Sequence, residues 1–517
     1  MHSAMPQLLA PLQEHASLQA LSLVLVFLLI TVRLATSRSR TGRLLNKLPS
    51  PPSRLPIIGH LHLVGSLPHV TLRDLARKHG PDMILLRLGA VPTLVVSSPC
   101  AARAVLRTHD HLFASRPRSA VGDILFYGNT NVAFAPYGDY WRRTRKIAAV
   151  HLLTVSKVRS FRPARENEVR LVLARMRAVA AASSAVDLSE VLSNFSNDVV
   201  CHAVVGRLPR EEGRNKLFRD LFKTNSMLLS GFNLDDYFPG LARLGLVRRV
   251  VCAKAVKQRK RWDELLDDLI DKHASERVLS DEESDFIDVL LSVQEEYNLT
   301  RENIKAILMD MFEAGTDTTY ISLDYCMAEL MRKPQVMAKL QAEVRSCTAK
   351  EKELVTEDDL SSMSYLSAVM KETFRLHPSG SLLLPHFSTA DCDVEGYTIP
   401  SGTRLLVNAW ALGRDTSSWG EDAEEFIPER FMDGNLEADS DYQGGDFRFL
   451  PFGSGRRICP GINFATMTFK LIVANLVNHF NWELPPGSPG VDMTEVFGMD
   501  VHRKEKLLLI PRVSNDF

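Results

Sequence analysis

One cysteine of the chain lies among residue types that would hold it as a metal ligand. Residues 450–465 read LPFGSGRRICPGINFA, which places Cys459 two positions after Arg457 and two before Gly461. A thiolate just before a helix is stabilised by the helix dipole and by free backbone N–H groups. Arginine supplies a planar cation that suits carboxylates, and glycine lets the backbone approach a flat ligand. We therefore predict that Cys459 is a thiolate metal ligand, because a buried structural cysteine would explain neither the arginines nor the glycines.

A second group of chemically active residues lies inside a predicted helix. Residues 314–319 read AGTDTT, so a glycine, an acid and three threonines stand in an otherwise apolar stretch. Ala314 and Thr318 are four residues apart and share one face of a helix, and a threonine hydroxyl can bond back to the preceding turn. This arrangement predicts a polar groove in which Asp317 and Thr318 relay protons. The alternative is a glycine that serves packing, beside polar side chains that face solvent.

Two further motifs carry charges at spacings that suit an ion-pair network. Glu372 and Arg375 are three residues apart and can pair on one face of a helix. Arg430 lies in a predicted turn or loop, PERF at residues 428–431. Each signal is weak alone, because most exposed pairs contribute little stability. If Arg430 reached Glu372, the three residues would lock a loop against a helix.

Together these motifs resemble one family. The stretch FGSGRRICPG is similar to the F-x-x-G-x-R-x-C-x-G signature of the cytochrome P-450 haem-thiolate monooxygenases, a long and specific pattern. Residues 314–319 resemble the oxygen-activation segment of that family, and WRRTR at 141–145 resembles its haem-propionate helix. The motifs at 372–375 and 430 resemble its Glu-Arg-Arg lock. All of them occur in family order across residues 48–511.

The resemblance implies a haem b cofactor and a role for each matching residue. The thiolate of Cys459 would be the proximal ligand of the haem iron, while Asp317 and Thr318 would deliver protons to bound dioxygen. The residues implied in holding the haem are Trp141, Arg145, His386, Phe452, Arg457 and Gly461. The residues implied in lining the substrate site are Phe126, Ala314, Gly380, Leu382 and Phe497.

The resemblance narrows to the plant group-A enzymes, through YGDYWRRTRK, GFNLDDYFPGLARL, FEAGTDTTY, LLLPHFSTADC and DMTEVFG. Within that group the chain is similar to the grass branch that hydroxylates indole and indolinones on the way to benzoxazinoid defence compounds such as DIBOA. The implied activity is NADPH- and O2-dependent hydroxylation of a small apolar metabolite, an indole or indolin-2-one type heterocycle. Another plant metabolite, such as a terpenoid or a phenylpropanoid, is the alternative.

One segment departs from the pattern of that branch. Residues 377–381 read HPSGS where the branch has His-Pro-Pro-x-Pro. Two missing prolines and the glycine at position 380 should loosen and enlarge this wall of the pocket.

The sequence pattern is mainly α-helical with little β-structure, and the resemblance implies the cytochrome P-450 fold as the scaffold that positions these residues. Residues 300–331 form the longest predicted helix, with Thr300 as N-cap and Glu302 in the first turn. A helix of this length runs about 48 Å and would cross the whole domain. Its apolar residues occur nearly all round, which predicts burial. Residues 462–477 predict a second apolar helix, and residues 83–98 predict a β-hairpin.

The N-terminal region predicts a membrane anchor. Residues 16–35 contain a single charge, and about 20 apolar residues in a helix span a bilayer core. Basic residues at 33–47 follow the apolar stretch, whereas a cleaved signal peptide has them before it, and they predict a cytosolic body. We expect residues 1–35 to be a single-pass anchor in the endoplasmic reticulum membrane, contacting its lipid. Residues 36–56 would be a basic and proline-rich linker, and residues 57–517 one large haem-thiolate monooxygenase domain.

Composition favours a globular enzyme and argues against a nucleic-acid binder. The chain of 517 residues has 62 basic and 62 acidic side chains, so its formal net charge is zero, whereas nucleic-acid binding needs a basic surplus. Its seven cysteines show no C-x-x-C spacing, which favours a reducing compartment over disulfides or zinc.

The electrons must come from another protein, because no G-x-G-x-x-G fingerprint of a flavin or nicotinamide site is present. The resemblance implies NADPH–cytochrome P-450 reductase as the donor. Arg142, Arg143 and Lys146 would dock it, and a merely solvated basic helix face is the alternative.

Two other functions remain open. A haem-thiolate isomerase or dehydratase needs no oxygen, and such enzymes tend to lack the acid–threonine pair found at 317–318. A membrane-tethered haem carrier or gas sensor would need neither a lined pocket nor a reductase. Consumption of NADPH with purified reductase would separate both from a monooxygenase.

Overall fold

The structure is a computed structural model. It describes residues 39–514 apart from 207–212, 232, 243–244, 276–283, 350–351 and 433–439, and apart from the side chains of 241–251. The predicted anchor over residues 1–35 lies outside the described residues. Among the helices that are described, none has both the length and the apolar character needed to cross a bilayer.

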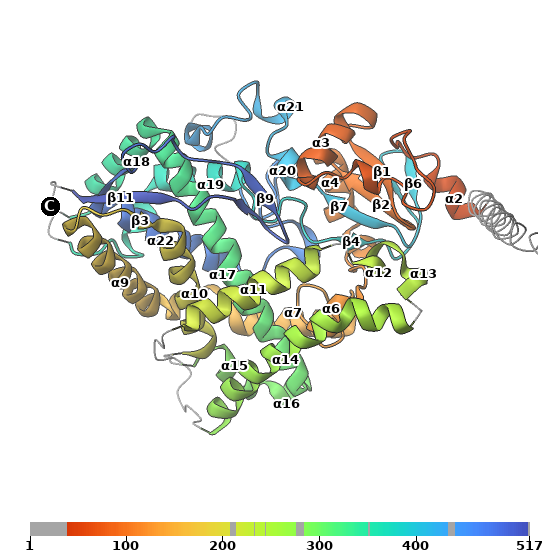
Figure 1. The fold of residues 1–517 in the computed structure, drawn as a ribbon, viewed down its shortest axis with the longest axis horizontal. Coiled ribbons are helices and arrows are strands. Elements are labelled where there is room, and N and C mark those ends of the chain that lie inside the picture. The colour runs from red at the N-terminus through yellow and green to blue at the C-terminus, as the bar shows by residue number, and fades with distance from the viewer. Residues whose placement is uncertain are drawn as a thin grey trace, which may run out of the picture.

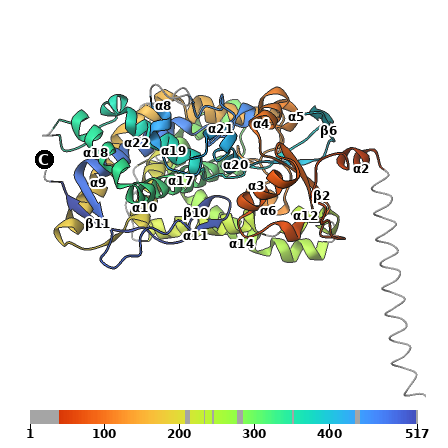
Figure 2. The ribbon, with the colours of Figure 1, turned by 90° about the horizontal axis from the view of Figure 1, so that it is seen from above.

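Long helices build the larger part of the molecule and surround the longest of them (Figure 1). The central helices are α9 (Arg162–Ala181), α10 (Leu188–Val205), α17 (Arg301–Arg332), α18 (Pro334–Cys347), α19 (Ser364–Leu376) and α22 (Ile462–His479). Two more, α11 (Arg214–Ser230) and α14 (Gly245–Ser275), lie side by side across one face (Figure 2). The predicted mainly α fold is confirmed.

The long helix α17 begins where the sequence predicts. The Thr300 side chain accepts a hydrogen bond from the Asn303 backbone at 3.2 Å, and the Asn303 side chain accepts one from the Thr300 backbone at 3.0 Å. This reciprocal cap satisfies N–H groups that a helix start leaves unpaired. The helix runs unbroken through Gly315, where an added Cβ would lie 2.9 Å from a methyl group of Val200 on α10. Gly315 therefore serves close helix packing, which is part of the alternative considered for this segment.

A mixed four-stranded sheet, with strand order β1-β2-β7-β4, lies at the end of the molecule away from helices α9 and α18 (Figure 1). The predicted hairpin is confirmed: β1 pairs antiparallel with β2, and Met83 faces Val96. The strands of this sheet are β1 (Met83–Leu88), β2 (Val91–Val96), β7 (Arg404–Val407) and β4 (His386–Phe387). The smaller sheets contain β3 (Val186–Asp187), β11 (Leu508–Val513) and β8 (Phe480–Glu483); β5 (Cys392–Val394) and β6 (Tyr397–Ile399); and β9 (Glu495–Phe497) and β10 (Val501–Arg503).

Short helices connect these elements. They are α2 (Arg40–Leu45), α3 (Pro68–His79), α4 (Pro99–Arg103), α5 (Asp110–Phe113), α6 (Ala120–Leu125), α7 (Asp139–Ile147), α8 (Val155–Ser160), α12 (Leu234–Tyr237), α13 (Pro239–Ala242), α15 (Phe286–Ser292), α16 (Gln294–Tyr297), α20 (Ala409–Leu412) and α21 (Thr416–Trp419). Single helical turns of other types are η1 (Leu61–Leu63), η2 (Ala104–Thr108), η3 (Ala148–Leu152), η4 (Asp359–Ser362), η5 (Pro428–Phe431) and η6 (Gly455–Arg457).

The segment predicted as a linker is partly built into the folded body. Ser39 caps α2 through a 2.9 Å hydrogen bond from the Gly42 backbone. Leu45 and Leu48 are buried in the apolar cluster beneath the four-stranded sheet. Residues from about 45 onwards therefore belong to the domain, and its predicted start at residue 57 is too late.

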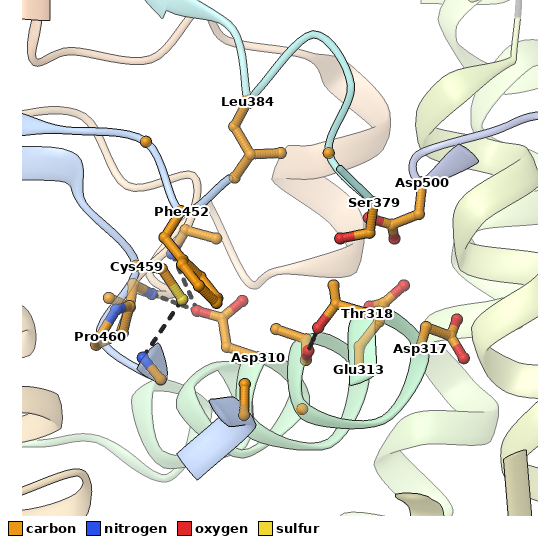
Figure 3. A pocket seen from close by; sticks show the side chains of 18 of the residues that line it. Asp310, Glu313, Asp317, Thr318, Ser379, Leu384, Phe452, Cys459, Pro460 and Asp500 are labelled. Atoms are coloured by element: carbon orange, nitrogen blue, oxygen red, sulfur yellow. Dashed lines mark hydrogen bonds between the residues drawn. The ribbon is translucent and has the colours of Figure 1, made fainter. Parts of the chain in front are cut away.

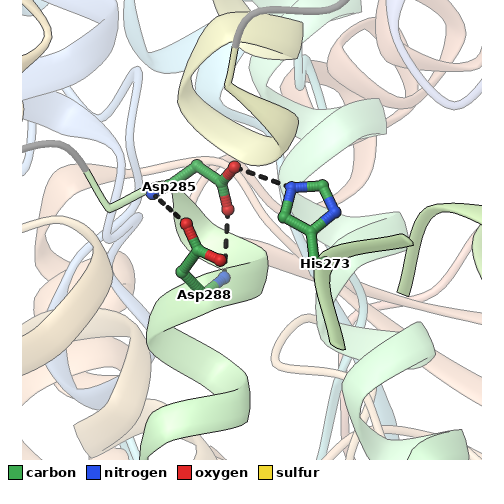
Figure 4. A group of neighbouring side chains, drawn as sticks. All are labelled: His273, Asp285 and Asp288. Carbon is green, nitrogen blue, oxygen red and sulfur yellow. Dashed lines mark hydrogen bonds and ion pairs between the residues drawn. The ribbon is translucent and has the colours of Figure 1, made fainter. Parts of the chain in front are cut away.

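A buried ion pair joins the end of α14 to the start of α15 (Figure 4). His273 Nε2 lies 2.9 Å from Asp285 Oδ2, and His273 Nδ1 lies 2.7 Å from the Leu269 carbonyl oxygen. Both ring nitrogens thus face acceptors, as in a doubly protonated imidazolium. Burial by itself lowers the pKa of His273, but Asp285 and the Leu269 carbonyl outweigh it and raise the pKa to about 9. Asp285, Asp288 and His273 are close enough to hold a metal ion, yet an imidazolium has no lone pair for one.

We expect the substitution His273→Gln to destabilise the protein in a pH-dependent way. A pKa raised from 6.5 to about 9 on folding gives stability that is complete below about pH 6.5 and is lost as the pH rises through 9. The deficit of the variant should be about 2 kcal/mol at pH 6, after allowance for solvent screening, and near zero above pH 9.5. Thermal unfolding at each pH measures it, with the exposed His111→Gln as control. A deficit that does not depend on pH would contradict the imidazolium assignment.

Candidate functional site: a cavity between a thiol, three arginines and helix α17

Three of the predicted motifs, residues 141–145, residues 314–319 and the loop of Cys459, contribute to one cavity of about 330 Å³, part of which is drawn in Figure 3. One wall is the loop that carries Cys459, and the facing wall is α17 with Ala314, Asp317 and Thr318. Segments far apart in the sequence therefore meet here.

Cys459 sits immediately before α22. Its Sγ accepts a hydrogen bond from the Gly461 backbone at 3.3 Å, and its own N–H donates to the Phe452 carbonyl at 2.9 Å. Burial raises the pKa of the Cys459 thiol, while the Gly461 amide and the positive charge of Arg145 act in the opposite direction. The helix start alone therefore does not make Cys459 an anion. A coordinated metal ion would complete its deprotonation.

The glycines around Cys459 serve different purposes. Gly455 has a φ of +67°, and an added Cβ would lie 2.0 Å from the Leu106 carbonyl oxygen on η2. Gly455 is thus required by the turn and by protein packing, and it does not line the cavity. An added Cβ at Gly461 would make an ordinary 3.7 Å contact with the Cys459 sulfur. The role of Gly461 is therefore to donate its backbone N–H group to the Cys459 sulfur.

Three guanidinium groups line the cavity on the side of Cys459: Arg116, Arg145 and Arg457. Within the described part of the chain, no acidic side chain forms an ion pair with any of them. Burial and repulsion by the other two arginines lower the pKa of Arg457 to about 8. Burial alone lowers the pKa of Arg116 to about 9. Buried cations without a partner are costly, so this wall calls for an anionic ligand.

Backbone carbonyls, in place of acids, hold two of these arginines. Arg457 donates hydrogen bonds of 2.5 to 3.2 Å to the carbonyls of Ala114, Val132 and Ala135. Arg116 donates bonds of 2.8 to 3.0 Å to those of Ala133, Leu384 and Pro385. Carbonyls fix the direction of a guanidinium without neutralising its charge. Arg457 uses three of its five N–H groups in this way, which leaves two for a ligand.

The carboxylate of Asp310 on α17 holds the loop that supplies three of these six carbonyls, those of Val132, Ala133 and Ala135. It accepts hydrogen bonds from the Asn131 side chain at 2.7 Å and from the backbone N–H groups of Val132 and Ala133 at 2.6 and 3.0 Å. Burial raises the pKa of Asp310 to about 6, and these three hydrogen bonds oppose the rise. Asp310 thereby fixes the loop through its backbone N–H groups, and the backbone carbonyls of the same loop orient Arg116 and Arg457.

Trp141 and His386 also line the cavity, next to these arginines. The Trp141 indole N–H donates to the Val132 carbonyl at 3.0 Å, and the ring lies 4.1 Å from the Arg457 guanidinium. Trp141 thus supports Arg457 and has no N–H left for a ligand. His386 Nδ1 lies 2.9 Å from the Phe113 carbonyl oxygen. Burial, followed by the charges of Arg116 and Arg457, holds the pKa of His386 well below its usual value, so its imidazole is neutral.

The chain as a whole matches known proteins. Residues 49–510 match the family model described as Cytochrome P-450. The chain belongs to the cytochrome P-450 family. The indole-2-monooxygenase of Zea mays is 57% identical over 485 residues, which are 93% of this chain and 90% of that enzyme. The indolin-2-one monooxygenase of Zea mays is 51% identical over 516 residues, 97% and 96% of the two chains. A zebra fish cytochrome P-450 solved with progesterone superposes with a TM-score of 0.73 at 26% identity, covering 86% of this chain and 99% of that one.

The cofactor of this P-450 is therefore haem, with a cysteine thiolate on its iron. The cavity fits it: Cys459 offers the ligand atom, and the three unpaired arginines match the two carboxylates of haem b. Phe452 and Gly461 line the same cavity. Arg116 is in none of the sequence motifs and was missed, because only the folded chain brings it beside Arg457.

The α17 wall contains the acid–threonine pair. Thr318 lines the cavity, and its Oγ1 donates to the Ala314 carbonyl at 2.6 Å, within the helix. Burial, followed by the negative charge of Asp500, raises the pKa of Asp317 to about 7. Asp317 is thus able to exchange a proton near neutral pH. Three other acids that line the cavity, Asp310, Glu313 and Asp500, were not identified from the sequence.

The predicted substrate residues divide into two groups. Phe126, Ala314 and Gly380 line the cavity, whereas Leu382 and Phe497 do not. Leu382 is buried in a separate apolar cluster on the four-stranded sheet. Phe497 stacks on the ring of His69, with ring centroids 5.9 Å apart. Residues that follow them in the same two segments, Leu383, Leu384, Met499 and Asp500, line the cavity instead.

The predicted charged network forms around Glu372. Arg375 donates to both of its carboxylate oxygens at 2.7 Å, and both side chains are fully buried. The Ile427 backbone donates to Glu372 at 2.7 Å, so the pair ties α19 to the segment before η5. Arg430 Nε lies 3.6 Å from Glu372 without a hydrogen bond, and Arg430 donates mainly to the Trp419 and Asp422 carbonyls.

We expect Arg116→Met to weaken haem retention, because it removes one of the three cavity-lining cations that would hold the haem propionates. Charge-assisted hydrogen bonds contribute about 1.5–3 kcal/mol, so the rate of haem transfer to apomyoglobin should rise about tenfold. Arg116→Lys keeps the charge, so its rate of haem transfer should lie between those of the wild type and Arg116→Met. The exposed Arg118→Met is the matched control. An unchanged transfer rate in Arg116→Met would exclude Arg116 from the haem site.

Proposed function

We propose that this P-450 hydroxylates a small nitrogen heterocycle, of the indole or indolin-2-one type, in benzoxazinoid biosynthesis. The observation that carries the proposal is the similarity, over nearly the whole chain, to Zea mays enzymes named for these heterocycles. The cavity supports it, because Phe126 stacks on Phe134 with centroids 5.2 Å apart and forms an aromatic wall that suits a flat ring.

The residues of α17 support oxygen chemistry. Haem bound at Cys459 would supply the iron that binds dioxygen, and the Cys459 thiolate on that iron would favour O–O cleavage. Thr318 lines the cavity one helical turn from Ala314, whose carbonyl accepts the hydroxyl hydrogen. By rotating away from that carbonyl, the hydroxyl would donate its proton into the cavity, and Asp317, the preceding residue, would replenish it. An isomerase would not need this pair.

The exposed face of α7 supports docking of NADPH–cytochrome P-450 reductase. Arg142, Arg143 and Lys146 are exposed on this helix, while Trp141 and Arg145 on its other side line the cavity. An acidic reductase surface bound at these cations would thus deliver electrons beside the haem carboxylates. We place the enzyme at the endoplasmic reticulum membrane, anchored by its N-terminal segment.

The proposed function is tested with purified enzyme, plant reductase and NADPH. We expect indole or indolin-2-one to shift the Soret band on binding and to yield a product with one oxygen atom from labelled dioxygen. Absence of both effects, in an enzyme that still oxidises a terpenoid or phenylpropanoid, would overturn the substrate class and leave the monooxygenase class intact.

We expect Thr318→Ala to separate NADPH consumption from product formation. The variant loses a hydroxyl but little volume, so haem and substrate should still bind. General acid assistance is typically worth about 10²–10⁴-fold, and water replaces part of it. The ratio of product to NADPH should therefore fall at least about tenfold while hydrogen peroxide rises. Thr316→Ala is the control, because Thr316 is buried on α17 outside the cavity. An unchanged ratio in Thr318→Ala would mean that Thr318 only packs.

A further inference from the structure

Two carboxyl groups in the cavity are not used by the haem or by the proton path. Glu313 projects from α17, and Asp500 lies in the turn between β9 and β10. Figure 3 shows both on the side of the cavity away from Cys459, with Asp500 next to Ser379. Polar groups in an apolar cavity either have partners or bind a ligand.

Glu313 is held in place by a second layer of buried side chains. The Asn225 oxygen accepts hydrogen bonds from Gln258 at 2.9 Å and from Trp262 at 3.3 Å. The amide of Asn225 can therefore only donate on its other side, and it donates to Glu313 Oε2 at 3.1 Å. Asn225 and Trp262 are fully buried. One carboxyl oxygen of Glu313 is thus fixed, and Oε1 has no hydrogen-bond partner among the described residues.

Asp500 is placed by the backbone on either side of it. The Met499 N–H donates to Ser226 Oγ of α11 at 3.1 Å. The Val501 N–H donates to the Ser379 carbonyl at 2.9 Å. The Asp500 carboxyl itself forms no hydrogen bond or ion pair with the described part of the chain. It is a preorganised acceptor that faces the cavity.

The two carboxyl groups differ in charge. Burial holds the pKa of Glu313 well above its usual value, although Asn225 opposes the rise. This favours the protonated acid, and because Oε2 accepts from Asn225, its O–H is the one on Oε1 and can donate to the cavity. Burial raises the pKa of Asp500 only to about 6, and a carboxyl accepts hydrogen bonds in either form. The cavity thus contains one fixed donor and one fixed acceptor.

We propose that Glu313 and Asp500 recognise the amide edge of a lactam: the Glu313 hydroxyl donates to the ring carbonyl, and the ring N–H donates to Asp500. This proposal rests on the proposed function and refines its substrate class. Indolin-2-one has N–H and C=O on adjacent ring atoms, whereas indole has only the N–H. A site with buried polar groups rejects ligands that leave those groups unpaired, so the geometry favours the lactam over indole.

The test compares three ligands with the intact holoenzyme by Soret titration: indolin-2-one, 1-methylindolin-2-one without the N–H, and indoline without the carbonyl. One hydrogen bond contributes about a factor of ten in affinity in a closed site. We expect the wild type to prefer indolin-2-one over each analogue by about tenfold.

Each variant should remove one preference only. Asp500→Ala should bind the two lactams equally, while Asp500→Asn, which keeps an acceptor, should still discriminate. Glu313→Met should lose the preference over indoline, while Glu313→Gln should keep it, because the Asn225 amide orients the glutamine N–H2 towards the cavity. Asp492→Asn, an exposed acid before β9, is the charge control, and the carbon monoxide spectrum checks that each variant is folded.

Equal affinity of the wild type for all three ligands would overturn the lactam proposal and leave the proposed substrate class standing. The same holds if the methylated lactam is rejected as strongly by Asp500→Ala as by the wild type. If no heterocycle binds the wild type, the proposed function fails and the lactam proposal fails with it.

Discussion

The haem side of the cavity depends on the hydrogen bonds that the Asp310 carboxylate of α17 accepts. Their donors are the backbone N–H groups of Val132 and Ala133, and the carbonyls of the same loop orient Arg116 and Arg457. Because carbonyls direct a guanidinium without neutralising it, the protein can bury cations in the right geometry and leave their charge for the cofactor. The free energy that their burial costs before cofactor binding is offset when the haem carboxylates arrive, since buried opposite charges attract strongly.

The cavity has two ends of opposite chemistry. Cations and the thiol lie at one end, and Glu313, Asp317 and Asp500 lie at the other. The separation keeps the haem carboxylates away from these three acids and leaves the three for the substrate and for protons, while Asp310, the acid near Cys459, is occupied by three hydrogen bonds. Helix α17 contributes to both ends, since Asp310 and Asp317 are seven residues apart on it. Its unbroken course past Gly315 therefore fixes the distance between cofactor chemistry and substrate recognition.

The sequence predicted the parts of the site that are defined by local spacing. Cys459 before a helix, the Thr300 cap and the Glu372–Arg375 pair all depend on neighbours a few residues away, and the structure has each of them. Arg116, Asp310, Glu313 and Asp500 depend on contacts across the fold, and no local pattern marks them. Leu382 and Phe497 show a third case: the right segments were identified, but the neighbouring side chains face the cavity. The linker boundary was misplaced because the burial of Leu45 and Leu48 depends on a distant sheet.

Asn225 and Ser226 are consecutive residues of α11, and each supports one of the two carboxyl groups, Asn225 through Glu313 and Ser226 through the turn that carries Asp500. Asn225 itself does not line the cavity. A single dipeptide on a covering helix thus controls the orientation of both recognition groups at once. Enzymes that diverged at these two positions would acquire a new ligand preference while every residue of the haem end stayed the same. For protein engineering, this makes α11 a place to change selectivity independently of catalytic competence.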